Sequence, residues 1–288
     1  MNLGRLATWS PLALWQAEPD HGRAAAAELE QLGYGTIWLG NGPAVLEVAE
    51  ELLAATRAVT VATGVLNVWT HPDADRVAAT ASRLDRCYPG RFLLGLGSGP
   101  RSAEEAAQSA YRKLNGYLDQ LDRAGIDPRQ RVLGSLGPRM LALAAARSAG
   151  AFPLLTTPEH TKLGRRLLGQ GPLLAVEQGI VLDTDPARAR ETARRDLAFY
   201  LPKASYRRTL GRLGFTEDDL AEGGSDRLVD GLVPNGVPAI SARIGEHLAA
   251  GADHVAIQPL TSGTHAESRD RSLPREEFRQ LAVALGSF

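Results

Sequence analysis

Residues 86–99, RCYPGRFLLGLGSG, join the end of a helical segment to an apolar run that closes on three alternate glycines. An apolar run in this setting predicts a buried strand, and the glycines predict a tight turn at its end. A dinucleotide fingerprint would need G-x-G-x-x-G after the first strand. Here Gly95, Gly97 and Gly99 are followed by Pro100, in the fourth predicted strand–helix unit. Spacing and position therefore both argue against that fingerprint.

The alternation of short apolar runs with longer Ala- and Leu-rich segments extends along the whole chain. The predicted strands are 3–8, 36–40, 59–67, 92–97, 131–137, 151–156, 173–182 and 253–260. Helices such as 20–33 and 73–87 separate them. This order predicts an α/β fold, namely a parallel (β/α)8 TIM barrel, with an open doubly wound sheet as the alternative.

One connection departs from this rhythm, because residues 185–236 read as helix upon helix after the seventh strand. We interpret them as a helical insertion that forms a lid or flank. No polar linker divides the chain, so residues 1–288 are predicted to form one domain. The basic stretch 203–213 is read as a solvated lid helix, because 217–222 offsets its charge.

Composition excludes several classes of protein. Lys and Arg (32) nearly balance Asp and Glu (33), so no overall field favours nucleic acid or an anionic membrane. Cys87 is the only cysteine, which excludes an internal disulfide and any multi-cysteine metal centre, and we predict no metal site. The chain shows no signal peptide and no apolar stretch of membrane-spanning length. The expected location is the cytoplasm, and the expected partner is a small molecule.

Several stretches, taken in order, resemble the bacterial luciferase-like flavin and deazaflavin oxidoreductases, and within them the group that uses coenzyme F420. They are 33-GYGTIWLGN-41, 60-TVATGVLNVWTHP-72, 86-RCYPGRFLLGLGSG-99, 133-LGSLGPRMLALAAARSAG-150 and 246-EHLAAGADHVAIQPL-260. The resemblance implies a luciferase-like barrel that binds a flat isoalloxazine or deazaflavin ring at the carboxyl-terminal mouth.

The resemblance also implies where the ring lies. Members of the family often carry a non-prolyl cis peptide in the third strand, and the matching bond here is Gly64–Val65. The residues expected to back or touch the ring are Gly64, Val65, Leu66, Asn67, Gly97, Ser98 and Gly99.

An anion site is predicted where the fifth strand leads into a helix through Gly137 and Pro138, because free N–H groups and the helix dipole meet there. The neighbours Leu136 and Arg139 belong to this candidate site, although Arg139 could equally face solvent. Thr156, Thr157 and His160 surround a second helix start. Ordinary N-capping by Thr157 with a solvated His160 is the alternative.

The catalytic groups are less clearly marked. Relatives that oxidise alcohols or sugar phosphates carry Asp-His after the second strand and Glu after the glycines, where this chain has Gly40-Asn41 and Pro100. Asn41 can form hydrogen bonds but is no acid or base near neutral pH, so a reductase or monooxygenase-type enzyme is favoured. Glu177 and Gln178, inside the seventh strand, are candidates for a proton donor or a ring contact.

A substrate pocket is predicted around the remaining polar and aromatic groups at strand ends, although the tryptophans could be ordinary packing. These residues are Thr8, Trp9, Ser10 and Trp69.

Two classes of function remain open. The first is an F420-dependent oxidoreductase, with an FMN-dependent monooxygenase of the same fold as its variant. The second is a non-catalytic barrel that binds a flavin or deazaflavin. Relatives commonly dimerise, so a homodimer is expected, with 43–57 and 73–87 as candidate contact helices.

Overall fold

The computed structural model describes residues 3–17, 19–99, 101–102, 105, 108–264 and 271–286. Its strands form one parallel sheet in the order β3-β2-β1-β9-β8-β7-β6-β5-β4, and pairing of β3 with β5 closes it into a barrel. The strands are β1 (Leu6–Ser10), β2 (Thr36–Leu39), β3 (Thr60–Thr63), β4 (Leu66–Asn67), β5 (Phe92–Gly97), β6 (Arg131–Leu133), β7 (Gly150–Ala151), β8 (Leu173–Ile180) and β9 (His254–Pro259). Because β3 and β4 are two halves of one barrel strand, the predicted eight-stranded TIM barrel is confirmed.

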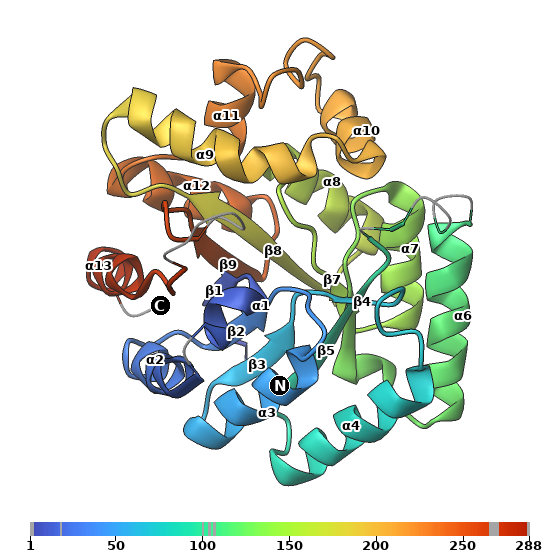
Figure 1. Ribbon diagram of the computed structural model, residues 1–288. Helices are drawn as coiled ribbons and strands as arrows, with labels where there is room; N and C mark the ends of the chain where they lie inside the picture. The colour runs from blue at the N-terminus through green and yellow to red at the C-terminus, as the bar shows by residue number, and fades with distance from the viewer. Residues whose placement is uncertain are drawn as a thin grey trace.

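Helices surround this barrel (Figure 1). They are α1 (Leu12–Gln16), α2 (Pro19–Gln31), α3 (Val45–Ala55), α4 (Ala74–Cys87), α6 (Ala110–Arg123), α7 (Pro138–Arg147), α8 (Pro158–Leu168), α9 (Pro186–Tyr200), α10 (Ala204–Arg212), α11 (Asp226–Leu232), α12 (Val237–Ala249) and α13 (Arg275–Leu285). A 3-10 turn, η1 (Pro128–Gln130), precedes β6. Within the described residues, no helix combines the length and the apolar character that crossing a membrane requires.

The predicted strands are all present, but several differ in extent, and the predicted strand 131–137 is only Arg131–Leu133. The predicted strand 59–67 is interrupted at Gly64–Val65, where the chain leaves the ladder and rejoins it as β4. The predicted strand 151–156 is only Gly150–Ala151, because the chain then turns toward the start of α8. Helix boundaries followed their signals: Asp73 caps α4 by accepting a hydrogen bond from the Arg76 N–H at 2.9 Å.

Two faces of the strands build two cores. Side chains that alternate outward from the strands pack against the helices, while the barrel interior holds small and aromatic residues. The rings of Trp38 and Phe152 stack inside it with centroids 3.9 Å apart. The indole N–H of Trp38 donates to His254 at 2.8 Å, so this buried polar group is satisfied.

The predicted insertion is confirmed as helical, and α9, α10 and α11 share an apolar cluster of their own. That cluster includes Leu155, Val181 and Leu260, which follow β7, β8 and β9 respectively. Figure 1 shows α9, α10 and α11 grouped beside the end of β8 and away from α2, α3 and α4. The insertion therefore covers the carboxyl-terminal ends of these three strands, where barrel proteins carry their sites.

The glycines of β5 allow a close approach of β3. A Cβ on Gly95 would lie 1.9 Å from the carbonyl oxygen of Thr63. The Thr63 hydroxyl donates to the Gly95 carbonyl at 2.7 Å and accepts from the Gly95 N–H at 2.8 Å. This contact needs a residue without a side chain, so the strand itself explains Gly95 without a ligand.

Candidate active site

The break in the third barrel strand forms a bulge at the mouth. The Gly64–Val65 peptide is cis, as the family resemblance implied. The indole N–H of Trp9 donates to the Gly64 carbonyl at 2.6 Å, and the side-chain oxygen of Asn41 accepts from the Asn67 N–H at 2.9 Å. Asn41 and Trp9 thus hold the bulge in place, which is a positioning role that the sequence did not suggest for Asn41.

The glycine stretch after β5 lies beside this bulge. A Cβ on Gly97 would lie 2.4 Å from Cγ2 of Val65, so Gly97 makes room for Val65. The Ser98 carbonyl accepts from the Trp69 indole at 3.0 Å, which ties down Trp69. Gly99 is exposed and faces open space. Pro100, which the sequence contrasts with a carboxylate in relatives, lies outside the described residues.

Three predicted contacts do not face the barrel interior. Trp9 belongs to the interior cluster, so Thr8 and Ser10, which alternate with it along β1, point to the opposite face of the sheet. Leu66 is fully buried in the core between barrel and helices. The sequence analysis placed Thr8, Ser10 and Leu66 at the mouth because it did not decide which side of the sheet each side chain faces.

Gln178 is likewise engaged outside the barrel. Its side-chain nitrogen donates to the Leu232 carbonyl at 2.8 Å, and its oxygen lies 2.9 Å from Nε2 of His247 on α12. The hydroxyl of Thr161 contacts Nδ1 of the same histidine at 2.8 Å. These bonds occupy the amide, and the candidate catalytic role of Gln178 is corrected to a structural one.

Glu177, one residue earlier, points into the barrel instead. Its side chain is only 3% exposed. The backbone N–H of Leu155 donates to its Oε2 at 2.9 Å. Burial raises the pKa of the carboxyl to about 8, against the hydrogen bond from Leu155, and the nearby Asp196 raises it further. Glu177 is therefore held mainly as the neutral acid near pH 7, as a proton donor requires.

The insertion adds polar groups that the sequence analysis missed. Asp196 and Tyr200 extend the buried face of α9, and burial raises the pKa of Asp196 to about 7 although Gln258 of β9 hydrogen bonds to it. The rings of Tyr200 and Tyr206 lie 5.1 Å apart. The sequence did contain a signal for Asp196: it is a carboxylate three residues after Ala193, on a helix face that is otherwise apolar.

The predicted anion site brings two helix starts together. Neither Gly137 at α7 nor Thr157 at α8 offers a side-chain cap to its helix. Nε2 of His160 lies 2.8 Å from the Leu136 carbonyl, which ties the two helix starts together. The hydroxyl of Thr156 and Nδ1 of His160 are buried and have no hydrogen-bond partner in the described residues. Buried polar atoms are normally paired, so these two atoms call for a ligand or water.

The Thr157 hydroxyl differs from these two atoms because it lies near a charged group. It also lacks a hydrogen bond of proper geometry, yet the same hydroxyl is the largest cause of a lowered pKa for the exposed carboxyl of Glu159. The contact between this hydroxyl and the Glu159 carboxyl is therefore a weak one. The solvated His160 of the alternative interpretation is wrong, because the ring is buried, and burial lowers its pKa.

Arginines gather next to these helix starts. Nη1 of Arg212, on α10, lies 3.7 Å from the position of a Cβ on Gly137. Arg208 lies one turn earlier on the same helix, and neither forms an ion pair with any residue that the structure describes. Arg139 stacks on the ring of Tyr111 at 4.6 Å. The positive charge of Arg208 and Arg212 is therefore not neutralised within the described residues.

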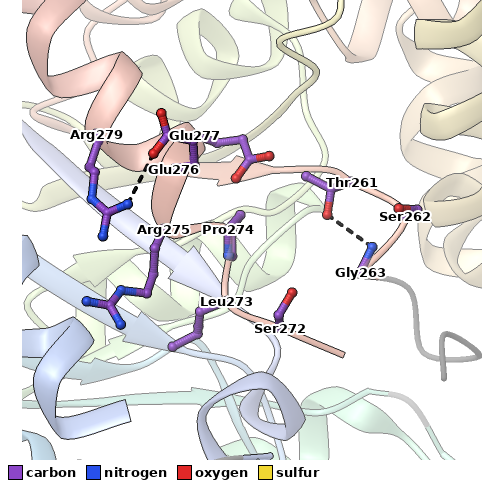
Figure 2. Close-up of a pocket in the computed structure, with 10 residues that line it drawn as sticks. All are labelled: Thr261, Ser262, Gly263, Ser272, Leu273, Pro274, Arg275, Glu276, Glu277 and Arg279. Carbon is purple, nitrogen blue, oxygen red and sulfur yellow. Dashed lines mark hydrogen bonds and ion pairs between the residues drawn. The ribbon is translucent and has the colours of Figure 1, made fainter. Parts of the chain in front are cut away.

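Figure 2 shows a separate hollow of about 660 Å³ between the residues that follow β9 and the start of α13. Its arginines, Arg275 and Arg279, are already paired with Glu28. Residues 265–270, which join its walls in sequence, are not among the described residues. Because the hollow holds none of the unpartnered polar groups, the barrel mouth is the better candidate for the active site. Across the described part of the chain, no three His, Cys, Asp or Glu side chains converge to hold a metal ion.

Sequence comparison agrees with this geometry. Residues 4–124, which include β1 to β5 and the cis bulge, match the profile of the luciferase-like monooxygenase family. The amino-terminal part of the chain therefore resembles the luciferase-like monooxygenase family. It is 30% identical over 161 residues to a 4-hydroxyprotoasukamycin monooxygenase from Streptomyces nodosus subsp. asukaensis, a match that covers 49% of this chain. The match spans 42% of that relative, less than half of its length.

Solved structures of other proteins share the whole barrel. An F420-dependent secondary alcohol dehydrogenase, in complex with an F420-acetone adduct, aligns over 98% of this chain and 99% of its own with a TM-score of 0.73 and 13% identity. The oxygenating constituent of the 3,6-diketocamphane monooxygenase of Pseudomonas putida, in complex with FMN, aligns over 97% and 96% with a TM-score of 0.67 and 13% identity. At these identities the likeness establishes the fold, and both coenzymes occur among the neighbours.

Proposed function

We propose that this luciferase-like protein is an F420-dependent oxidoreductase that transfers hydride to a small organic substrate. The observation that carries the proposal is the set of unpartnered groups at the starts of α7 and α8, next to unpaired arginines of α10. A phosphate with a further anionic extension matches such a site, because helix starts and guanidinium groups both bind anions.

The polar atoms fit a phosphorylated polyol chain. The Leu136 carbonyl can only accept, so Nε2 of His160 carries the proton and Nδ1 is an acceptor in the neutral ring. A ligand hydroxyl would satisfy Nδ1, and the Thr156 hydroxyl can donate to a ligand oxygen. Arg212 would pair with an anionic group beside Gly137.

Protein side chains would support the chemistry at the mouth. A bound deazaflavin would supply the hydride, which is the intrinsic chemistry of that coenzyme. Glu177, largely neutral near pH 7 and directed inward, can hold a proton for the substrate. The insertion excludes water above β7 to β9, and Asn41 supplies no base, so reduction is favoured over alcohol oxidation.

An FMN-dependent monooxygenase is the second candidate, since the relative that matches in sequence is a monooxygenase. The two candidates differ in the length of the anionic tail. A single phosphate would engage the helix starts alone, whereas the longer tail of F420 would also reach the exposed arginines of α10.

Fluorescence titration of the purified protein with F420 and with FMN tests the proposal. We expect micromolar binding of F420, and Arg212→Gln should weaken it about tenfold, less so at high salt. Arg195→Gln is the matched control, because Arg195 is an exposed arginine of α9 that pairs with Glu191. Tighter binding of FMN than of F420 would select the monooxygenase, and binding of F420 without turnover of any reducible substrate would favour a non-catalytic barrel.

A further inference from the structure

Two consecutive residues of β8 hold one segment of the chain from opposite sides of the sheet. Glu177 points into the barrel, and its Oε2 accepts a hydrogen bond from the Leu155 N–H at 2.9 Å. Gln178 points toward the helices, and its Oε1 lies 2.9 Å from Nε2 of His247 on α12. Because successive side chains of a strand face opposite sides, the two residues can reach the two ends of the same segment.

The far end of this segment is Thr161, in the second turn of α8. Its hydroxyl lies 2.8 Å from Nδ1 of His247, and both side chains are fully buried. The Thr161 N–H also donates to the Thr157 carbonyl at 3.1 Å, which closes the first turn of the helix. Residues 155–161 are therefore bonded to β8 at one end directly and at the other end through His247.

The direction of each hydrogen bond around His247 is fixed. The Leu232 carbonyl can only accept, so the Gln178 nitrogen faces it at 2.8 Å and the Gln178 oxygen faces His247. Nε2 of His247 therefore carries the proton, and Nδ1 accepts from the Thr161 hydroxyl. Burial lowers the pKa of His247 to about 3, so the ring stays neutral. His247 thus needs both partners in the places where the structure has them.

The helix that carries His247 is itself anchored to the insertion. Gly231 and Leu232 are the last residues of α11, and the final carbonyls of a helix have no partner within it. Gln178 donates to the Leu232 carbonyl, and Arg243, one turn before His247 on α12, donates to the Gly231 carbonyl at 2.7 Å. The position of His247 is therefore set by β8, α11 and α12 together.

The segment between the two attachments carries the unpartnered atoms of the candidate site. These are the Thr156 hydroxyl and Nδ1 of His160, both buried and without a hydrogen-bond partner in the part of the chain that the structure describes. His160 and Thr161 are consecutive in α8, so they project about 100° apart around the helix axis. One contacts the Leu136 carbonyl and the other contacts His247, which fixes the rotation of α8 about that axis.

The conformation at the start of the segment depends on such attachments. Leu155 has a φ of 53°, a region that few residues other than glycine adopt. A backbone conformation of this kind persists where the surrounding contacts hold it. The hydrogen bond to Glu177 is one such contact, and packing of the Leu155 side chain in the apolar cluster of the insertion is another.

We infer that His247 is a positioning residue of the ligand site. Through the hydroxyl of Thr161 it fixes the start of α8. The Thr156 hydroxyl and Nδ1 of His160 are thereby kept in the orientation that the ligand requires. His247 acts through α8 and not by contact with the ligand. The inference rests on the proposed function for the identity of that ligand, the phosphorylated tail of the coenzyme.

Removal of a single hydroxyl tests the inference. Thr161→Val keeps the size of the side chain and leaves Nδ1 of His247 without a donor. We expect it to raise the Kd of F420, measured by fluorescence titration, about tenfold. Thr161→Ser keeps the hydroxyl and should restore the Kd to within about twofold of the wild-type value. An unchanged Kd in Thr161→Val would overturn the inference.

A control variant separates positioning from loss of stability. Val48→Ala truncates a buried side chain of α3, which packs against α2 and β3. It should lower the free energy of unfolding in urea and leave the Kd of F420 unchanged. If Val48→Ala raises the Kd as much as Thr161→Val does, the contact with His247 only stabilises the fold, and the inference is wrong.

Hydrogen exchange reports on the segment itself. Thr161→Val should accelerate amide exchange about tenfold in a peptide that contains residues 155–161, and it should leave the exchange of residues 45–55 in α3 unchanged. Equal acceleration in both peptides, or none in either, would contradict a local positioning role.

A double variant tests whether the effect passes through His247. Thr161→Val and Gln178→Leu remove the two partners of the same imidazole. Their combined effect on the Kd of F420 should therefore be smaller than the product of the two single fold-changes. A combined effect equal to that product would show that the two residues act independently, against the inference.

The outcomes also distinguish this inference from the proposed function. Normal F420 binding by the wild type, with an unchanged Kd in Thr161→Val, would refute the positioning role alone. Failure of the wild type to bind F420 would refute the coenzyme assignment, and inorganic phosphate would then be titrated against the same variants with the same expected ratios. If phosphate does not bind at millimolar concentration either, there is no anion site for His247 to position, and both proposals fall.

Discussion

Replacing the glycines of β5 by alanine should produce a graded loss of stability that follows the space at each position. At Gly95 the new Cβ would lie 1.9 Å from the Thr63 carbonyl oxygen, about 1.5 Å short of ordinary contact, and the obstacle is backbone. At Gly97 the obstacle is the Val65 side chain at 2.4 Å. At Gly99 nothing lies within 4 Å. None of the three has the positive φ that would itself oppose alanine.

The expected magnitudes follow from what must move. Gly95→Ala separates β3 from β5 and breaks both hydrogen bonds with Thr63, so about 3 kcal/mol or more should be lost. Gly97→Ala requires only the β-branched Val65 to shift, at a cost of about 1–2 kcal/mol. Gly99→Ala should stay within about 0.5 kcal/mol of the wild type.

Urea unfolding followed by fluorescence and circular dichroism measures the series. A double variant provides an internal check, because Val65→Ala removes the atom that Gly97→Ala strikes and should recover most of the loss. Equal stability of Gly95→Ala and Gly99→Ala would refute the reasoning, as would a Gly97→Ala loss that is unchanged when Val65 is truncated.

Three further predictions concern buried polar groups, each measured by denaturant unfolding. Because the pKa of Glu177 is raised from 4.5 to about 8, the wild type should lose stability relative to Glu177→Gln as the pH rises through that window. The pKa of His254 is lowered from 6.5 to about 4, so the wild type should lose stability relative to His254→Gln as the pH falls through that window. Glutamine keeps a hydrogen-bond acceptor for the Trp38 indole. Parallel pH profiles of the two proteins would contradict the prediction. Gln178→Leu should cost at least about 2 kcal/mol by leaving Nε2 of His247 and the Leu232 carbonyl unpaired, and a neutral effect would restore a functional interpretation of Gln178.

The fold was largely predictable because its signals are local. Alternating apolar runs predicted every strand, and Asp73 marked the start of α4. The meeting of two helix starts, at Gly137 and Thr157, was predictable because parallel strands deliver all their carboxyl-terminal ends to one mouth. Thr8, Ser10 and Gln178 were misplaced because a polar residue at a strand end can face either side of the sheet.

The sequence by itself determined the repeating strand–helix order, the helical insertion and the family resemblance, since these depend on periodicity and spacing along the chain. Only the tertiary structure decided which polar groups remain unpartnered. Thr161, Gln178 and His247 are far apart in sequence, and the packing of α8 and α12 against β8 brings the three together. Burial raises the pKa of Glu177 and lowers that of His247, because desolvation depends on every element that surrounds a group and cannot be read from its neighbours in the chain.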